Sequence, residues 1–256
     1  MRTEIVEVSG TRIAYLATDA GSGAPAVFIH GAGGCKELWR AQIRHLDKKA
    51  FATAIDLPGH GDSGGEALDT IEGYVELVVK FLDALGIDKA IVCGHSMGGA
   101  IAQKLALTYP ERAHALVLVA TGARLRVAPL IFELLKSDPG KFAELYRQWG
   151  FSRNAKRATV DAAVEMLMKC PPEFIARDFA ACDRFDVMDD VSKITAPALV
   201  VGAELDALTP PKYSMYLAEH IPDARLHILE DCGHTIPLEK PLVLARLIAD
   251  FVESMR

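Results

Sequence analysis

A serine is set between glycines in residues 94–99, which read Gly-His-Ser-Met-Gly-Gly. An apolar run at 90–93 precedes this segment, and a pattern with helical spacing follows it. This context predicts a sharp turn from a strand into a helix that exposes the hydroxyl of Ser96. Glycines two residues before and after the serine remove side chains that would clash in so tight a turn. Ser96 is therefore the candidate nucleophile, and a glycine-rich turn without chemistry is the alternative.

A serine nucleophile needs a base, and the base needs an acid that orients it. With this motif the acid and then the histidine follow the serine along the chain. His234 is the histidine that lies in a loop leaving a late apolar run, and it is the candidate base. Four other histidines fall within predicted helices or strands, where surface exposure or packing explains them: His45, His114, His220 and His227.

The candidate acid is Asp206, in the loop after the apolar run at 199–202 and just before the turn-forming residues 209–211. The carboxyl ends of parallel strands meet at one edge of a sheet, so this acid, the histidine and the serine are expected to lie close together. Three neighbouring carboxylates remain as alternatives: Glu204, which is the runner-up, Glu230 and Asp231.

Backbone N–H groups are expected to stabilise the negative charge that develops when a serine attacks a carbonyl. The N–H of Met97 opens the helix after the serine, where the helix dipole favours negative charge. A second donor is expected in residues 30–34, His-Gly-Ala-Gly-Gly, whose small side chains let an N–H turn inward. We assign it to Ala32, and expect His30 to brace this loop rather than transfer protons.

Two rival motifs fail on their context. Residues 59–64 match the glycine pattern of a dinucleotide site, but they open no helix and no ribose-binding acid follows at the required distance. They are expected to form a structural loop held by Asp56 and His60. Cys232 and His234 stand without a second ligand pair at zinc spacing, so no metal site is predicted.

The elements that must position these residues follow from hydropathy. Near-continuous apolar runs, typical of parallel strands buried on both faces, occur at 26–30, 51–55, 89–93, 115–120, 198–201 and 225–229. Helical patterns alternate with these runs, except in one long stretch that is helical throughout. We therefore predict a discontinuous α/β core domain of residues 1–121 and 191–256, with a helical cap, or lid, inserted at 122–190.

The cap supplies apolar side chains that are expected to shape a substrate pocket. The candidates are Leu125, Leu130, Phe132, Trp149, Met166 and Phe179. Packing between the cap helices is the alternative role for at least half of the apolar residues in this region. Three arginines offer partners for a substrate carboxylate, although exposed helix faces commonly carry such charges: Arg124, Arg126 and Arg177.

Composition excludes several classes of protein. Of 256 residues, 50% are hydrophobic and 24% are charged, with a net charge of −6, so neither a disordered chain nor a basic nucleic-acid binder is expected. Five cysteines without a Cys-x-x-Cys pair favour free thiols, and hence a cytoplasmic location. No apolar stretch reaches the ~18 residues of a membrane helix, so no membrane partner is expected.

These motifs together resemble the α/β-hydrolase superfamily, in its serine-nucleophile, esterase-like branch. The resemblance rests on residues 30–33, 56–63, 94–99, 202–206 and 233–234 in this order. It implies an eight-stranded, mostly parallel sheet flanked by helices, with the second strand antiparallel and an inserted cap. It also implies a catalytic triad of Ser96, Asp206 and His234, and no cofactor. A serine at the nucleophile position argues against the dehalogenases and epoxide hydrolases, which carry aspartate there.

The leading functional hypothesis is a serine hydrolase that cleaves a small-to-medium, largely apolar carboxylic ester through an acyl-enzyme. The alternatives are a lactonase, a carbon–carbon bond hydrolase or a perhydrolase that uses the same triad. A ligand receptor with this fold is the alternative from another class, and an intact triad argues against it. A small-molecule substrate is the expected partner.

Overall fold

Eight strands form one sheet in the computed structural model, which describes residues 1–19, 21 and 23–255. The order across the sheet is β1-β2-β4-β3-β5-β6-β7-β8, and β2 runs antiparallel to both of its neighbours. The other pairs are parallel, so the expected mostly parallel sheet is confirmed. The strands are β1 (Arg2–Val8), β2 (Thr11–Ala17), β3 (Gly23–Ile29), β4 (Ala50–Ile55), β5 (Ala90–His95), β6 (Ala113–Val119), β7 (Ala198–Ala203) and β8 (Ala224–Leu229).

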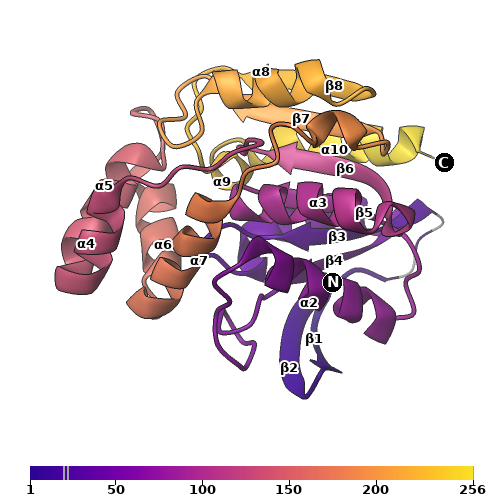
Figure 1. The fold of residues 1–256 in the computed structure, drawn as a ribbon, viewed down its shortest axis with the longest axis horizontal. Coiled ribbons are helices and arrows are strands. Elements are labelled where there is room, and N and C mark those ends of the chain that lie inside the picture. Colours follow the sequence, from indigo (N-terminus) through magenta and orange to yellow (C-terminus); the bar gives the residue numbers. More distant parts are fainter. Residues whose placement is uncertain (20, 22, 256) are drawn as a thin grey trace.

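Helices cover both faces of the sheet (Figure 1). One face packs against α1 (Arg40–Leu46) and α10 (Pro241–Ser254). The other packs against α2 (Ile71–Ala84), α3 (Met97–Thr108) and α8 (Pro211–His220). Short helical turns complete these layers: η1 (Lys36–Trp39), η2 (Pro110–Arg112), η3 (Val191–Lys193) and α9 (Ile236–Glu239).

The central strands show why the sequence pattern was continuous rather than alternating. Every residue of β5 and β7 is buried, because each face of these strands meets a helical layer. Val92 packs into the core on the α2 and α3 side, whereas its neighbour Ile91 packs into the core on the α1 and α10 side. Two apolar cores therefore hold the central strands, and with them the loops at their carboxyl ends.

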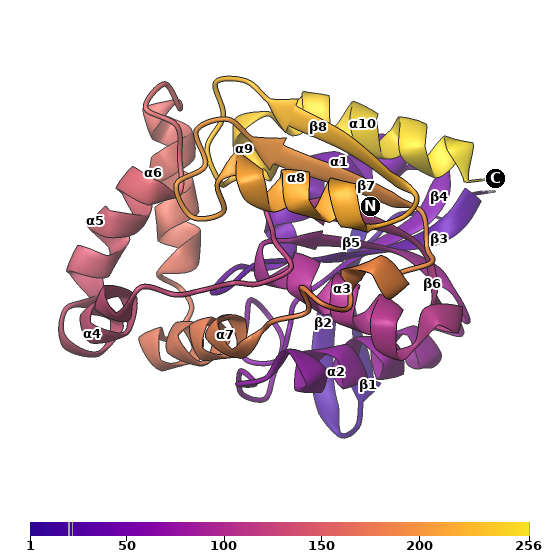
Figure 2. The same ribbon diagram turned by 45° about the horizontal axis from the view of Figure 1, so that its top comes forward.

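Four helices follow β6 and lie together beyond the carboxyl ends of the central strands (Figures 1 and 2). They are α4 (Pro129–Ser137), α5 (Pro139–Trp149), α6 (Arg157–Leu167) and α7 (Pro172–Arg184). Three of them begin at proline, which suits the first position of a helix because its missing N–H would be unpaired there. They share a small apolar core that includes Leu135, Phe142 and Ile175. The helical pattern predicted for this stretch is confirmed, and its division from the core as a separate domain stays a prediction.

Two features depart from the simple sequence pattern. The segment between β3 and β4 is not one continuous helix but the turn η1 followed by α1, which ends at Leu46 because Asp47 has a non-helical ψ of 132°. Strand β8 is the sheet edge, and three of its six residues are exposed. None of the helices in the described residues is both long and apolar enough to cross a membrane.

Candidate active site

Ser96 occupies the turn between β5 and α3 in a conformation that L-residues rarely adopt. Its φ is 53° and its ψ is −115°. Such a backbone costs on the order of 1–3 kcal/mol and persists only where its surroundings fix it. The Ser96 N–H donates to the carbonyl of Val119 at 2.9 Å, and the Thr121 hydroxyl donates to the Ser96 carbonyl at 2.8 Å. These bonds hold the serine at the sheet edge, half-buried beside buried neighbours.

The two flanking glycines are required by close contacts between backbones. A Cβ at Gly94 would collide with the carbonyl oxygen of Gly98, and one at Gly98 would collide with the carbonyl oxygen of Ile29. Helix α3 therefore starts directly against β3 and β5. The structure thus confirms the strand, tight turn and helix that the sequence predicts around this serine.

Asp206 and His234 lie together in the loops that follow β7 and β8. His234 Nδ1 is 2.9 Å from Asp206 Oδ2, and both side chains are buried. The backbone N–H groups of Leu208 and Thr209 donate to Asp206 Oδ1 at 2.8 Å each, and the Thr209 hydroxyl donates to Oδ2 at 2.8 Å. Burial raises the pKa of Asp206, but the nearby His234 and the Thr209 donors outweigh it and lower the pKa, so the carboxylate stays ionised.

The alternative acids lie elsewhere in these loops. Glu204 accepts the N–H of Asp231 at 3.1 Å, and both residues are exposed, as is Glu230. Asp206 contacts the histidine because the chain turns back at Thr209, whose side chain also lies 3.2 Å from His234 Nδ1. The spacing Asp-x-x-Thr is the sequence signal for this role of Thr209, in addition to its place in a turn.

Ser96 and His234 line the same cavity. No hydrogen bond joins their side chains in the part of the chain that the structure describes. His95 packs beneath the histidine with ring centroids 4.9 Å apart, and its Nε2 donates to the His234 carbonyl at 3.0 Å. Burial lowers the pKa of His95 to about 3, which keeps it neutral. His95 thus positions the backbone of His234.

The loop at residues 31–34 passes directly over the serine. Its Gly34 N–H donates to the Gly31 carbonyl at 3.0 Å, which closes a turn with Ala32 as its second residue. A Cβ at Gly31 would lie 3.1 Å from the Ser96 Cβ. Among the described residues, neither the Ala32 N–H nor the Met97 N–H donates to a protein acceptor. Two backbone donors without partners therefore flank the serine.

Hydrogen bonds to His30 and Asp56 brace the loop at residues 31–34 from below. The Leu57 N–H donates to His30 Nε2 at 3.1 Å, so His30 Nδ1 carries the proton and donates to the Gly31 carbonyl at 2.8 Å. Burial lowers the pKa of His30 well below its usual value, which fits a neutral brace. Asp56 accepts from the Lys36 N–H at 2.6 Å and from Lys36 Nζ at 2.7 Å.

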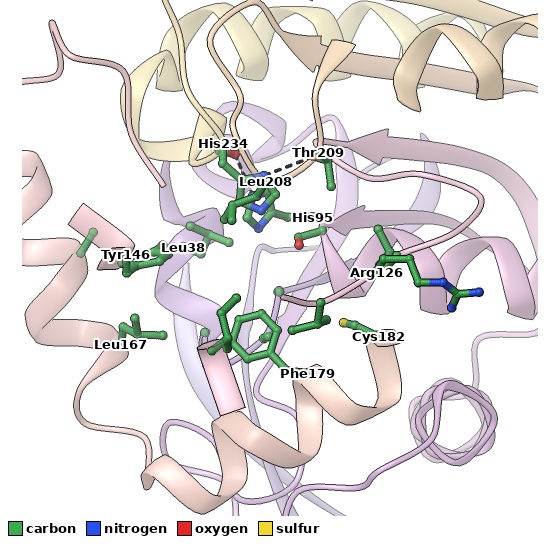
Figure 3. A pocket seen from close by; sticks show the side chains of 18 of the residues that line it. Leu38, His95, Arg126, Tyr146, Leu167, Phe179, Cys182, Leu208, Thr209 and His234 are labelled. Atoms are coloured by element: carbon green, nitrogen blue, oxygen red, sulfur yellow. Dashed lines mark hydrogen bonds between the residues drawn. The ribbon is translucent and has the colours of Figure 1, made fainter. Parts of the chain in front are cut away.

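A cavity of about 100 Å³ opens over the serine between the sheet edge and α4–α7. Figure 3 shows His234, Thr209 and His95 on one side of it, and Phe179 and Leu167 facing them from the other. Its lining is mainly apolar and includes three of the predicted pocket residues, namely Leu125, Met166 and Phe179.

The other three predicted pocket residues do not line this cavity. Leu130 is 43% exposed at the start of α4, Phe132 is half-buried on the same helix, and Trp149 packs against the shared core of α4–α7. A helix turns only one face toward the cavity, and the sequence did not show which face that is. Further lining residues, which were not predicted from the sequence, include Leu38, Tyr146, Leu167, Leu208 and Tyr213.

The three arginines that could receive a substrate carboxylate already pair with acidic side chains. Arg124 Nε lies 2.6 Å from Asp186, which Arg126 also approaches at 3.6 Å. Arg177 lies 2.8 Å from Glu66. Of the three, Arg126 also lines the cavity. A substrate carboxylate would therefore have to compete with existing ion pairs for these arginines.

The cysteines are free, as expected. Burial raises the pKa of Cys35 to about 11 and that of Cys232 to about 12. Burial also raises the pKa of the Cys93 and Cys182 thiols well above the usual value. A protonated thiol is a poor nucleophile, so Ser96 has no rival among these four residues.

The sheet topology and the strained serine after β5 define the class of α/β-type hydrolases. The model of the alpha/beta hydrolase family matches residues 26–247, and the chain belongs to this family.

Similar proteins include hydrolases that are named for different substrates. The chain is 27% identical to the pimeloyl-[acyl-carrier protein] methyl ester esterase of Neisseria meningitidis, covering 89% of this chain and 93% of that protein. It is 29% identical to the 2-hydroxy-6-oxo-6-phenylhexa-2,4-dienoate hydrolase of Comamonas testosteroni, covering 92% and 90%. The solved structure of a thermophilic esterase matches with a TM-score of 0.88 and 33% identity, covering 99% of this chain and 98% of that chain.

Proposed function

We propose that the protein hydrolyses carboxylic esters of small-to-medium, largely apolar substrates through an acyl-enzyme on Ser96. The observation that supports this most directly is the serine on its strained turn, in one cavity with the His234–Asp206 pair. The similarity to a thermophilic esterase at 33% identity supports the choice of an ester.

In the proposed reaction, Ser96 Oγ attacks the ester carbonyl while its proton moves to His234 Nε2. The N–H groups of Ala32 and Met97 bind the resulting oxyanion, a contribution on the order of 3 kcal/mol for each donor. The carbon–oxygen bond to the alcohol then breaks, and His234 returns the proton to the leaving oxygen. A water molecule repeats the sequence on the acyl-enzyme and releases the carboxylic acid. Asp206 keeps the imidazole oriented and stabilises its charged form.

The shape of the pocket supports substrates of limited size. The cavity over the serine is about 100 Å³, and a wider groove of about 560 Å³ shares Leu38, Ala163 and Met166 with it. A longer acyl or alcohol chain would reach this groove only past those three side chains. Short esters are therefore expected to react with least rearrangement. The cytoplasmic location also stays a prediction, supported by the free thiols.

A substrate panel tests the proposal. p-Nitrophenyl esters of increasing chain length, a lactone and a vinylogous diketone would be assayed with the wild-type protein and with Ser96→Ala. We expect turnover of the shorter esters and its loss in the variant. If only the lactone or only the diketone is turned over, the protein is a lactonase or a carbon–carbon bond hydrolase instead of an esterase. Absence of turnover across the panel would contradict the proposed chemistry and favour a binding role.

A further inference from the structure

A carboxylate on cap helix α7 is fully buried against the core of the molecule. The side chain of Asp178 has no exposed surface, although it is charged in water at neutral pH. It accepts the backbone N–H of Gly33 at 2.8 Å, a ring N–H of His60 at 2.8 Å, and the hydroxyl of Tyr74. The three donors come from three separate parts of the core. Asp178 therefore joins the cap to the turn over Ser96.

His60 neutralises this carboxylate. Its Nε2 faces Asp178, and its Nδ1 lies 2.9 Å from the carbonyl oxygen of Pro58. Since both neighbours accept hydrogen bonds, both ring nitrogens must carry protons, and the imidazole is positively charged. Burial disfavours this charge, but the hydrogen bond and charge of Asp178, together with the neighbouring Cys170, outweigh burial and raise the pKa of His60 to about 11. The pair is thus neutral overall and does not oppose negative charge developing near the turn.

The turn that Asp178 holds carries one of the two proposed oxyanion donors. Gly33 is its third residue and has a φ of +65°, as a type II turn requires at that position. The cap also confines Gly33, because an added Cβ would lie 2.6 Å from Leu167 and 3.0 Å from Ile175. The Gly33 N–H belongs to the peptide that follows Ala32. Fixing this N–H therefore fixes the orientation of the turn around the Ala32 N–H.

We propose that Asp178 is a positioning residue for the oxyanion hole, acting from the cap through Gly33. It touches no reacting atom. It holds the turn so that the Ala32 N–H points to the place where the oxyanion forms. A misplacement of 1 Å at such a site can cost about 100-fold in rate. This inference rests on the proposed ester hydrolysis, because the turn has an oxyanion to bind only if Ser96 attacks a carbonyl.

Two substitutions of Asp178 separate its hydrogen bonds from its charge. Asp178→Leu removes every acceptor, whereas Asp178→Asn keeps one oxygen for Gly33 and loses the charge. With p-nitrophenyl butyrate we expect kcat to fall about 100-fold in the leucine variant and about tenfold in the asparagine variant, with KM within about twofold of wild type. The affinity for a trifluoromethyl ketone, which forms a tetrahedral adduct with serine, should fall by the same factor as kcat/KM.

The matched control is Asp183→Asn on the same helix. Its carboxylate accepts the Val127 N–H at 3.0 Å and, among the described residues, forms no hydrogen bond with the turn at 31–34. The substitution is therefore expected to weaken the attachment of α7 without removing the bond to Gly33. We expect its kcat to stay within about threefold of wild type. If folded Asp178→Leu and Asp178→Asn retain the wild-type kcat, or if they change KM alone, the positioning role is wrong and Asp178 only packs the cap.

Amide hydrogen exchange at Gly33 gives a readout that does not depend on activity. We expect this amide to exchange at least about tenfold faster in Asp178→Leu than in wild type. In Asp178→Asn we expect partial protection of the same amide. The asparagine variant also provides the test if the leucine variant fails to fold. Equal exchange in wild type and Asp178→Asn, together with equal kcat, would overturn the inference. A different result is possible, in which the wild-type protein has no esterase activity but Gly33 is still protected in a way that depends on Asp178. That result would overturn the proposed function and the oxyanion role, and would leave only the contact between Asp178 and Gly33.

Discussion

Two buried histidine–aspartate pairs in this molecule have nearly the same geometry and different surroundings. His234 lies 2.9 Å from Asp206, and His60 lies 2.8 Å from Asp178. The second ring nitrogen of His60, Nδ1, donates a hydrogen bond to the Pro58 carbonyl. Among the described residues, no hydrogen-bond partner occupies the second nitrogen of His234, and this ring lines the cavity beside the candidate nucleophile.

This difference separates a pair able to move a proton from one that holds structure. A general base needs one ring nitrogen oriented by an acid and the other free to accept a proton. The His234 pair meets both requirements. In the His60 pair both ring nitrogens donate hydrogen bonds, so the imidazole keeps both of its protons. The pair is therefore an ion pair that joins the cap to the core. A short histidine–aspartate distance alone therefore does not identify a catalytic pair.

The largest expected contrast comes from the same amide substitution in each pair. Asp206→Asn should lower kcat by about 10⁴-fold, because an amide neither holds the required imidazole tautomer nor stabilises its charged form. This exceeds the roughly tenfold loss expected for Asp178→Asn by about three orders of magnitude. Steady-state kinetics on p-nitrophenyl butyrate would measure both.

Glu204→Gln is the control for this experiment, because Glu204 lies in the same loop and is exposed. Its kcat should stay within about twofold of wild type. If Glu204→Gln loses as much activity as Asp206→Asn, the assignment of the acid is wrong.

A smaller effect is expected from the Thr209 hydroxyl, which donates to the carboxylate of the His234 pair. Thr209→Val removes the bond to Asp206 Oδ2 but leaves the two backbone N–H donors on Oδ1. We expect kcat to fall about tenfold, the size of one hydrogen bond to a charged group. Thr3→Val, at an exposed position of β1, should leave kcat unchanged. An unchanged kcat in Thr209→Val would show that the backbone donors alone orient the acid.

The smallest effect concerns stability and pH in the His60 pair. The folded pKa of His60 is raised to about 11, above the unfolded value near 6.5. Its stabilising contribution is therefore fully present below about pH 6.5 and is lost as the pH rises toward 11. The difference in Tm between wild type and His60→Gln should be larger at pH 6 than at pH 10, by about 3 °C or more.

Differential scanning fluorimetry of both proteins across this pH range checks the prediction. His45→Gln, on the exposed side of α1, should give a small difference in Tm at every pH. A difference for His60→Gln that stays constant or grows with pH would contradict a charged His60 in the folded protein.

Much of the fold was predictable because each central strand is buried on both faces. The continuous apolar runs marked the strands, and glycine spacing marked the turn at Ser96, where backbone contacts exclude any side chain. The positions of Asp206 and His234 followed from chain order and from the common edge of parallel strands. These inferences need only local sequence patterns and the general geometry of parallel sheets, so a single sequence is enough to make them.

Contacts between segments that are distant along the chain left no comparable pattern in the sequence. Asp178 and His60 are 118 positions apart, and nothing near either residue indicates that they meet. For the same reason Trp149 was expected in the pocket, whereas Tyr146, one turn earlier on α5, lines it. The face that a cap helix presents depends on its packing against other helices, and their relative placement cannot be read from hydropathy.

The most direct test of the account is the site of covalent labelling by an alkyl fluorophosphonate, located by peptide mass spectrometry. We predict one adduct on Ser96, no adduct in Ser96→Ala, and a loss of ester turnover in that variant of about 10⁶-fold. Ser137→Ala, an exposed serine on α4, should label like wild type. Labelling at another residue, or ester turnover retained by purified Ser96→Ala, would contradict the central claim that Ser96 is the nucleophile.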